Sequence, residues 1–353
     1  MLWFFVCWFT IAIVISLVYS QIGYLFCVLY SPQARFPLLK LDYVAIREVL
    51  STLDPHDYIN FLKVSKSCRR LSTIKKHSKA RLIFKNFPRI IIGNGPGKYY
   101  VMWAQKVDTR APCKQQGCIK CSQNCLNDMK KFYQDVRSVM GVEIGSVVLH
   151  MDDFQGRCSE IVSWFRSISQ EVVDLSIYGK NPRHGDIQYL LDNLKCRDRL
   201  RIDVNTIEQL PFKIPESINT LFIIQGSWIT LDYVMSLKIS RMSFRNTYLT
   251  NQDINAFYKS WIEMESHQNL ECFEINLINP ANFVAVALRD IPYKTGTPIP
   301  KLFPDYAAIR GSFEVTRKDG QEASIVVFDL PEGAVASIYP WLPLINTEPI
   351  DRQ

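Results

Sequence analysis

Residues 146–151 read Ser-Val-Val-Leu-His-Met and begin a stretch, ending near residue 278, in which short β-rich runs recur. The runs are 20 to 31 residues apart, and each is followed by polar residues and then by an amphipathic segment. The six runs are SVVLHM (146–151), EVVDLSIY (171–178), LRIDV (200–204), NTLFII (219–224), ISRMSF (239–244) and LECFEINL (270–277). One strand and one helical segment per interval is typical of repeat solenoids, whose strands line a single face.

The clearest helical segment follows the fifth run. Thr250 stands where an N-cap residue is expected, and Asp253 is at the third helical position. The apolar residues that share one helical face are Ile254, Phe257, Tyr258, Trp261 and Ile262. We therefore predict an α/β fold for residues 145–330, namely a degenerate leucine-rich-repeat-like β/α domain. A doubly wound α/β sheet is the alternative, since the Leu/Asn consensus is degenerate.

The C-terminal part of the chain predicts a hairpin and an arm. Residues 313–317 and 324–328 flank Lys318-Asp319-Gly320, a turn sequence between two β-rich runs. A hairpin there would cap the open end of a solenoid, as terminal units must. Residues 331–353 are predicted to be a trailing C-terminal arm.

The composition is that of a folded protein. The 353 residues are 48% hydrophobic and 21% charged, which excludes a disordered or fibrous chain and allows two folded units. Ten cysteines are too few for a small disulfide-stapled scaffold. The net charge of +7 is concentrated at one end, since residues 35–110 hold 16 Lys and Arg against 5 Asp and Glu. The two ends are therefore expected to have different partners.

The first 34 residues contain no charged side chain, and residues 2–29 are almost wholly apolar. This length predicts an apolar N-terminal helix that could anchor the chain in a membrane. A cleaved signal peptide or an artefact of the gene model are the alternatives. Because Arg35, Lys40 and Arg47 follow the segment and none precedes it, the remainder is expected in the cytoplasm, with or without a membrane tether.

Residues 36–78 predict a compact helical module. Ile46, Val49, Leu50 and Leu53 share one helical face, and Asp54-Pro55 indicates the start of a second helix. The second helix is expected to carry Tyr58, Ile59, Leu62 and Ser65 on one side, with Cys68 and Leu71 continuing into a third helical turn.

This module resembles an F-box. The residues that carry the resemblance are Phe36-Pro37-Leu38-Leu39, Ile46-x-x-Val49-Leu50-x-x-Leu53-Asp54-Pro55, and Tyr58 through Cys68-Arg69-Arg70-Leu71. The departure is Phe36, where Leu is usual. A plain three-helix packing unit is the alternative.

The resemblance implies docking on the Skp adaptor of a cullin–RING ubiquitin ligase, in the manner of helices laid into a groove. The matching positions are Pro37, Leu38, Leu39, Ile46, Val49, Leu50, Leu53, Tyr58 and Leu62. Some of these residues must instead form the module's own core, and the sequence does not separate the two sets.

The basic run between Lys63 and Arg89 has ten Lys and Arg and no acidic residue. A solvated or membrane-facing surface is favoured over a nucleic-acid groove, because aromatic side chains for base stacking are few. The Gly-rich segment that follows is not a P-loop, since Ile92 and Tyr99 stand where Gly and Ser or Thr are needed. It predicts a hairpin within a Cys-rich connecting region, residues 80–135.

Four cysteines lie within thirteen residues: Cys113, Cys118, Cys121 and Cys125. They could close a zinc site, although a reduced surface loop without metal is favoured, so no cofactor is expected. No catalytic constellation emerges. Asp152-Asp153 is interpreted as the end of a strand rather than as a carboxylate pair, and the chain is predicted to be a non-enzyme.

Residues 199–277 also resemble the type-2 F-box-associated domain of nematode (Caenorhabditis-type) F-box proteins, through Leu249-Thr250-Asn251-Gln252-Asp253, Trp261 and Leu270-Glu271-Cys272-Phe273. The resemblance implies a substrate-recognition subunit, with residues 36–78 holding the Skp adaptor and its cullin scaffold and residues 145–330 holding a protein target. A membrane-anchored scaffold with no ligase link is the alternative. Nucleic-acid binding through the basic run is a third hypothesis.

Overall fold

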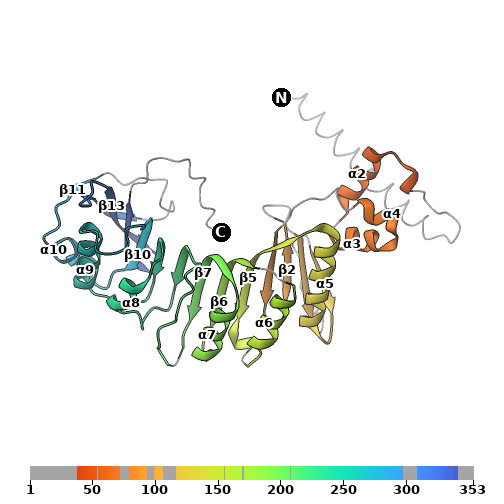
Figure 1. The fold of residues 1–353 in the computed structure, drawn as a ribbon, viewed down its shortest axis with the longest axis horizontal. Helices are drawn as coiled ribbons and strands as arrows, with labels where there is room; N and C mark the ends of the chain where they lie inside the picture. The colour runs from red at the N-terminus through yellow and green to blue at the C-terminus, as the bar shows by residue number, and fades with distance from the viewer. Residues whose placement is uncertain are drawn as a thin grey trace, which may run out of the picture. The chain divides into compact units, whose positions relative to one another are not determined.

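A computed structural model describes residues 38–53, 55–71, 79–93, 99–105, 117–154, 156–168, 171–206, 208–296 and 308–340. The chain divides into two compact units, Met1–Lys76 and His77–Gln353 (Figure 1). Two folded units are what the length of the chain allows.

Short helices make up the described part of the first unit. They are η1 (Leu38–Lys40), α2 (Tyr43–Thr52), α3 (Pro55–Val64) and α4 (Lys66–Arg69). Asp42 caps α2, because its carboxylate accepts a hydrogen bond from the N–H of Ala45 at 2.9 Å. Pro55 is the first residue of α3, a position at which its missing N–H is not needed. The predicted start of the second helix is therefore confirmed.

The second helix ends earlier than predicted. Ser65 does not lie on the face of α3 but caps α4, and its Oγ accepts the N–H of Cys68 at 3.1 Å. Serine competes for backbone N–H groups in this way, so it ends one helix and starts the next.

In the second unit, fourteen described strands form one sheet in the order β11-β12-β13-β14-β10-β9-β8-β7-β6-β5-β1-β2-β3-β4. On the N-terminal side lie β1 (Lys79–Phe84), β2 (Arg89–Ile92), β3 (Tyr99–Ala104) and β4 (Gly117–Cys121). The central strands are β5 (Glu143–His150), β6 (Val172–Gly179), β7 (Cys196–Val204), β8 (Thr220–Ile223), β9 (Arg241–Phe244) and β10 (Cys272–Asn276). The last four are β11 (Lys294–Thr295), β12 (Ala308–Thr316), β13 (Glu322–Leu330) and β14 (Gly333–Pro340).

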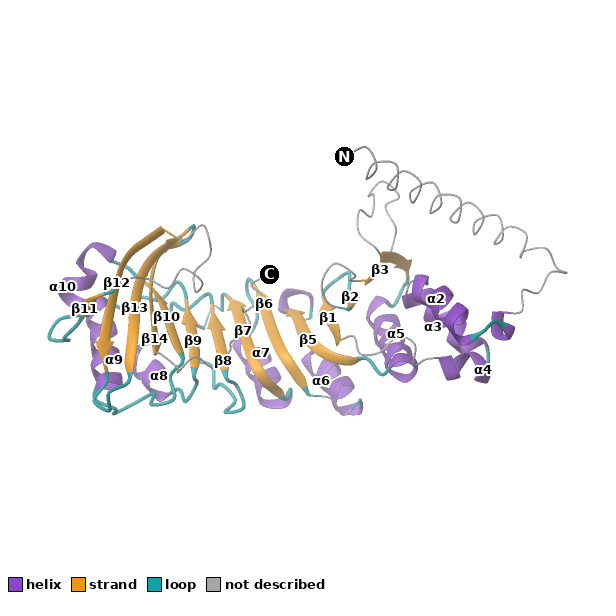
Figure 2. Cartoon of the chain, turned by 90° about the horizontal axis from the view of Figure 1, so that it is seen from above, coloured by secondary structure: helices purple, strands orange, loops and turns teal. Residues whose placement is uncertain are grey.

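The six predicted β-rich runs coincide with β5 to β10. From β5 to β10, each strand except the last pairs in parallel with the one that follows it along the chain (Figure 2). A doubly wound sheet reverses its strand order at a switch point. The order from β5 to β10 has no reversal, and the reversal between β1 and β5 lies outside the predicted repeats. The order favours stacked β/α units over the doubly wound alternative. The description as leucine-rich repeats stays a prediction.

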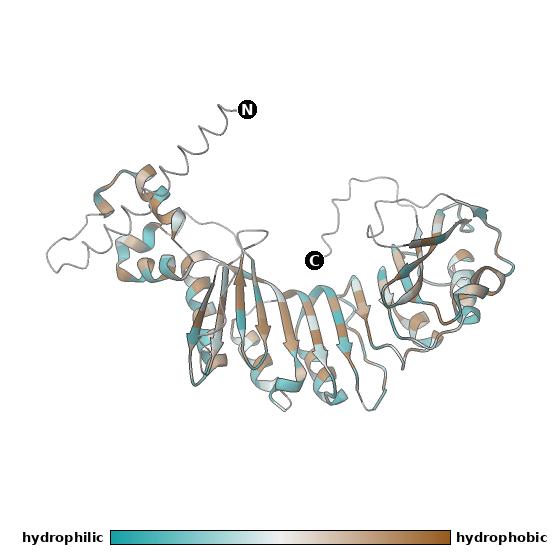
Figure 3. Cartoon of the chain, turned by 180° about the vertical axis from the view of Figure 1, so that it is seen from behind, coloured by the Kyte–Doolittle hydropathy of each residue, from teal (hydrophilic) through white to brown (hydrophobic). Residues whose placement is uncertain are grey.

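Helices connect the strands of the second unit. The α-helices are α5 (Cys125–Met140), α6 (Cys158–Ser167), α7 (His184–Asn193), α8 (Leu231–Ser236), α9 (Asn251–Ile262) and α10 (Phe283–Ala287). The described part of this unit also contains the 3₁₀ helices η4 (Met151–Asp153) and η5 (Pro280–Asn282). Both α6 and α7 lie in front of the strands in Figure 1 and behind them in Figure 3, so they cover one face of the sheet.

The predicted capping of α9 is confirmed. The Thr250 side chain accepts the N–H of Asp253, and the Asp253 carboxylate accepts the N–H of Thr250 at 2.8 Å. Of the five predicted core residues, all but Ile262 are at most 1% exposed.

The core of the sheet consists of two rows of apolar side chains that cross the strands. The pairing registers align Leu82, Val147, Leu175, Leu200, Leu221, Met242 and Phe273 in the first row. They align Phe84, Leu149, Ile177, Ile202, Ile223, Phe244 and Ile275 in the second row. Every one of these side chains is at most 1% exposed. Since side chains alternate between the faces of a strand, both rows lie on the same face of the sheet.

The segment 80–135 differs from the predicted connecting region. Its hairpin is present, since β2 pairs antiparallel with β3, but β1 lies beside β5 and extends the parallel part of the sheet. Residues 125–140 form α5, which ends at Gly141, in the left-handed conformation that glycine tolerates. The boundary predicted near residue 140 is therefore absent, because the pairing of β1 with β5 crosses it.

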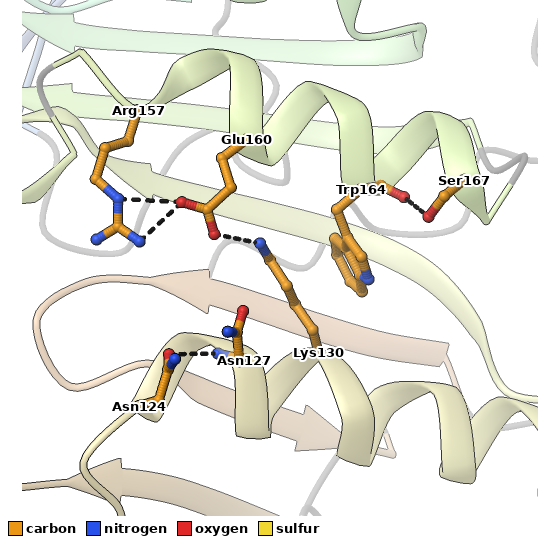
Figure 4. A network of polar contacts seen from close by, with 7 residues as sticks. All are labelled: Asn124, Asn127, Lys130, Arg157, Glu160, Trp164 and Ser167. Carbon is orange, nitrogen blue, oxygen red and sulfur yellow. Dashed lines mark hydrogen bonds and ion pairs between the residues drawn. The ribbon is translucent and has the colours of Figure 1, made fainter.

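Contacts between α5 and α6 also connect the segment before residue 140 to the segment after it (Figure 4). Lys130 of α5 donates to Glu160 of α6 at 2.7 Å, and its ammonium group lies 6.0 Å from the ring centre of Trp164. Arg157 also donates to Glu160, at 2.8 Å. Burial acts to raise the pKa of Glu160, but the two hydrogen-bonded cations outweigh it and lower that pKa.

The C-terminal end also differs from the prediction. The predicted hairpin is confirmed as β12 and β13, and Gly320 in its turn has a φ of 89°. Residues 333–340 are not an arm: they form β14, which pairs antiparallel with both β10 and β13. The parallel strands are thus capped by an antiparallel extension that β14 joins to them.

Among the described residues, no helix is both long and apolar enough to cross a membrane. The predicted anchor at residues 2–29 lies outside the described residues.

Candidate functional site

The first candidate surface is on the N-terminal unit, where the structure separates the predicted docking residues by burial. Ile46, Leu50, Tyr58 and Leu62 are at most 6% exposed and form the interior of the unit. Such side chains hold the helices together, so they are not available to a partner while the unit keeps this packing.

Other predicted docking residues reach the surface. Leu39 is 46% exposed and Val49 is 40% exposed, while Leu53 is half-buried. Pro37 and the side chain of Leu38 lie outside the described residues. The docking assignment of these residues stays a prediction.

Sequence reasoning missed two exposed apolar residues in the same region. Tyr43 and Val44, at the start of α2, are 58% and 60% exposed. The signal was available in the sequence, because both residues lie just before the apolar face that begins at Ile46. Exposed apolar side chains gathered on short helices are typical of a docking surface.

The second candidate surface is the face of the sheet that α6 and α7 leave uncovered, which we call the open face (Figure 3). Its first row comprises Arg81, Ser146, Asp174, Arg199, Thr220, Arg241 and Cys272. All seven of these residues are half-buried or exposed. Its second row comprises Ile83, Val148, Ser176, Arg201, Phe222, Ser243 and Glu274.

Ring and cation contacts line the open face at the ends of β5 and β6. His150 stacks on Tyr178 with ring centres 5.3 Å apart, and the Arg201 guanidinium lies 5.9 Å from the centre of the Tyr178 ring. Burial and the neighbouring Lys85 lower the pKa of His150. The imidazole is therefore neutral near pH 7.

The ion pairs in the middle of the open face are loose. Arg199 is 3.9 Å from Asp174, and Arg201 is 3.9 Å from Asp203, beyond hydrogen-bond distance. Burial raises the pKa of Asp174, and the charge of Arg199 offsets only part of this rise.

The open face ends in a tight polar cluster beside β14. Glu274 accepts hydrogen bonds from Arg245, from Ser243 at 3.0 Å and from Ser337 at 3.1 Å. All four residues are at most 9% exposed. These groups satisfy one another, so the cluster ties β14 to β9 and β10 rather than offering a binding site.

The zinc site at the four cysteines stays a prediction. No group of three or more His, Cys, Asp or Glu in the described part of the chain could hold a metal ion. Cys118 and Cys121 are three residues apart on β4, where an extended backbone separates their Cα atoms by about 10 Å. A zinc knuckle needs a tight turn between two such cysteines. Cys125 begins α5 and is buried, and Cys113 lies outside the described residues.

The two aspartates after β5 are structural. The Asp152 carboxylate accepts the N–H of Lys180 at 2.9 Å, and that of Asp153 accepts the N–H of Asn86 at 2.9 Å. Each aspartate thus satisfies backbone donors of a neighbouring loop, as expected for residues that end a strand.

Comparison with known families finds two matches within the chain. An F-box domain profile matches residues 38–78, and an F-box associated profile matches residues 209–275. The chain contains both domains. No curated protein and no solved structure gives a significant match.

The first match covers the described helices of the N-terminal unit, and the second covers β8 to β10 with α8 and α9. Together the two domains are typical of the non-catalytic substrate-recognition proteins of Skp–cullin–F-box ligases. The predicted presence of an F-box and of an F-box-associated domain is confirmed, while the bounds 36–78 and 145–330 stay predictions. The matches carry no information on a nematode origin, which stays a prediction.

Proposed function

We propose that this protein is a substrate receptor that docks on the Skp adaptor through residues 38–71 and holds a protein target through its second unit. The observation that carries the proposal is the F-box match over helices that expose apolar side chains. Exposure of the apolar side chains of Leu39 and Val49 to water costs free energy, and burial against a partner would remove this cost.

Val49 is the position at which to test docking. A Val49→Asp change leaves the interior of the unit intact, because this side chain is 40% exposed. A charge at Leu50, which is 0% exposed, would instead unfold the unit and could not be interpreted.

The matched control is Arg47→Asp on the same helix. Arg47 lies about 160° around α2 from Val49, and its side chain is 53% exposed. Both variants place a new carboxylate on α2, and both should keep the thermal stability of the wild type.

The experiment is co-purification of the full-length chain with the Skp adaptor. We expect the wild type and Arg47→Asp to retain the adaptor, and Val49→Asp to lose most of it, because an unpaired charge would be desolvated at an apolar contact. Failure of the wild type to retain the adaptor would overturn the proposal. Equal retention by all three chains would remove Val49 from the docking surface.

A further inference from the structure

Two arginines on the open face have donor groups that the fold does not use. Arg199 and Arg201 lie two residues apart on β7, so both point to the same side of the sheet. Their side chains are 46% and 42% exposed. No hydrogen bond from either guanidinium occurs within the described residues, and the buried Nε of Arg201 has no partner there.

Half-buried side chains of the flanking strands lie beside this pair. Arg201 is aligned with Ser176 of β6 on one side and with Phe222 of β8 on the other. Tyr178 lies beneath its guanidinium group. An arginine held over an aromatic ring is oriented in advance, so it loses less freedom when it binds an anion.

The acidic side chains nearby do not use these donors. Asp174 and Asp203 each approach one arginine no closer than 3.9 Å. Arg81, which joins the same row on β1, is exposed and adds a third guanidinium. By contrast, Arg241 farther along the row is held by Glu271 at 2.5 Å. Unused donors are therefore concentrated on the open face of β1 and β7.

The spacing of the arginine pair suggests the form of the ligand. Alternate residues of a strand are about 6.6 Å apart, and the same distance separates alternate residues of an extended peptide. A peptide lying along β7 with acidic side chains at alternate positions would present one anion to each arginine. Each guanidinium could then form the paired hydrogen bonds that anions accept from arginine.

We propose that the open face binds an extended acidic segment of a protein target, with Arg199 and Arg201 as the anion-binding residues and Tyr178 and Phe222 as the apolar floor. This inference deepens the proposed function and rests on it, because it locates the target on the second unit. Carboxylate and phosphate groups share the required chemistry.

A displayed library of random twelve-residue peptides, selected on the full-length protein, tests the proposal. We expect selected peptides to carry Asp or Glu at alternate positions and to bind at least about tenfold more weakly to the Arg199→Gln, Arg201→Gln double variant. Synthetic copies with Gln or with phosphoserine in place of the acidic residues distinguish neutral, carboxylate and phosphate ligands.

The matched control is Arg183→Gln, since Arg183 is an exposed arginine just before α7, in a connection outside the strands. It should bind the selected peptides as the wild type does. Enrichment of apolar or basic peptides, absence of enrichment, or tighter binding of a single-stranded DNA twelve-mer than of any acidic peptide would overturn the proposal. If the double variant still retains the Skp adaptor, a negative peptide result counts against peptide binding by the open face and not against docking on the adaptor.

Discussion

The side chain of Lys130 lies between α5 and α6 and is 10% exposed. Its Nζ atom is 2.7 Å from Oε1 of Glu160. Replacing Lys130 by Met keeps the apolar stem and removes the charged hydrogen bond. We expect the free energy of unfolding to fall by about 1.5 to 3 kcal/mol, as is usual for a hydrogen bond to a charged group. Urea denaturation checks this.

Lys131→Met is the matched control, because Lys131 is the next residue of α5 and is exposed. Its effect should stay below about 0.5 kcal/mol. Equal losses for the two variants would contradict a specific role for the contact of Lys130 with Glu160.

His150 gives the fold a dependence on pH. Burial and Lys85 lower its pKa, and this effect outweighs that of Asp153 and Asp152. A group whose pKa is lower in the folded state stabilises the fold above its unfolded pKa, about 6.5 for histidine, and loses this as the pH falls through the folded value.

We therefore expect the melting temperature to drop as the pH is lowered from about 7 to about 5. The drop should be smaller in His150→Phe, which keeps a ring against Tyr178. Circular dichroism melts at a series of pH values make the comparison. An identical drop in the variant would rule out His150 as a source of the dependence.

At the scale of elements, the turn of the β12–β13 hairpin is docked through Arg317, which is 8% exposed at its side chain. Its guanidinium donates to Gln268 at 2.9 Å and lies 5.3 Å from the centre of the Trp261 ring. Its hydrogen bonds to Asp319 lower the pKa of that carboxyl to about 2.

Arg317→Ala should reduce the free energy of unfolding by about 2 to 3 kcal/mol, because a buried, charged donor set is lost. The neighbouring Lys318→Ala should cost less than about 0.5 kcal/mol, since that side chain is 67% exposed and its ion pair with Glu263 is on the surface. Guanidinium denaturation measures both losses of unfolding free energy, and equal losses for the two variants would contradict this role of Arg317.

Local signals explain which elements could be predicted. The capping pair of α9 and the Gly-containing turn of the hairpin are encoded within a few residues, so both were recognisable. The helix α5 was missed although Leu126, Met129, Tyr133 and Val136 follow a helical spacing, because the cysteines before it suggested a loop. The docking of Arg317 on Gln268 joins residues 49 apart, which no local pattern reveals.

At the scale of the whole second unit, β14 is the strand that no local sequence pattern predicts. Its residues follow a short turn after β13 and look like a continuation of the chain's end, yet they pair with β10, about 60 residues earlier. The strand order from β5 to β10 could be predicted because its strands recur in sequence. The pairing of β14 with β10 and the pairing of β1 with β5 could not, since both depend on distant contacts.

A chain that stops before Gly333 should fail to fold its C-terminal part. It would expose the edge of β10 and leave Glu274 without Ser337. We expect such a chain to aggregate, as judged by size-exclusion chromatography. A monomeric chain with the wild-type melting temperature would show that β14 is dispensable, as an arm would be.

The two candidate surfaces differ in what sequence could establish. The F-box was predictable because its register is local, but the separation of buried Leu50 from exposed Val49 needed the fold. The open face could not be identified, because its rows gather one side chain from each of several strands far apart in sequence.

The most direct test of the receptor function is a calorimetric titration of the Skp adaptor into the full-length protein and into its Val49→Asp variant. We expect one adaptor to bind per wild-type chain, and the dissociation constant of the variant to be at least about tenfold higher at an unchanged melting temperature. No heat of binding with a folded wild-type chain would contradict it.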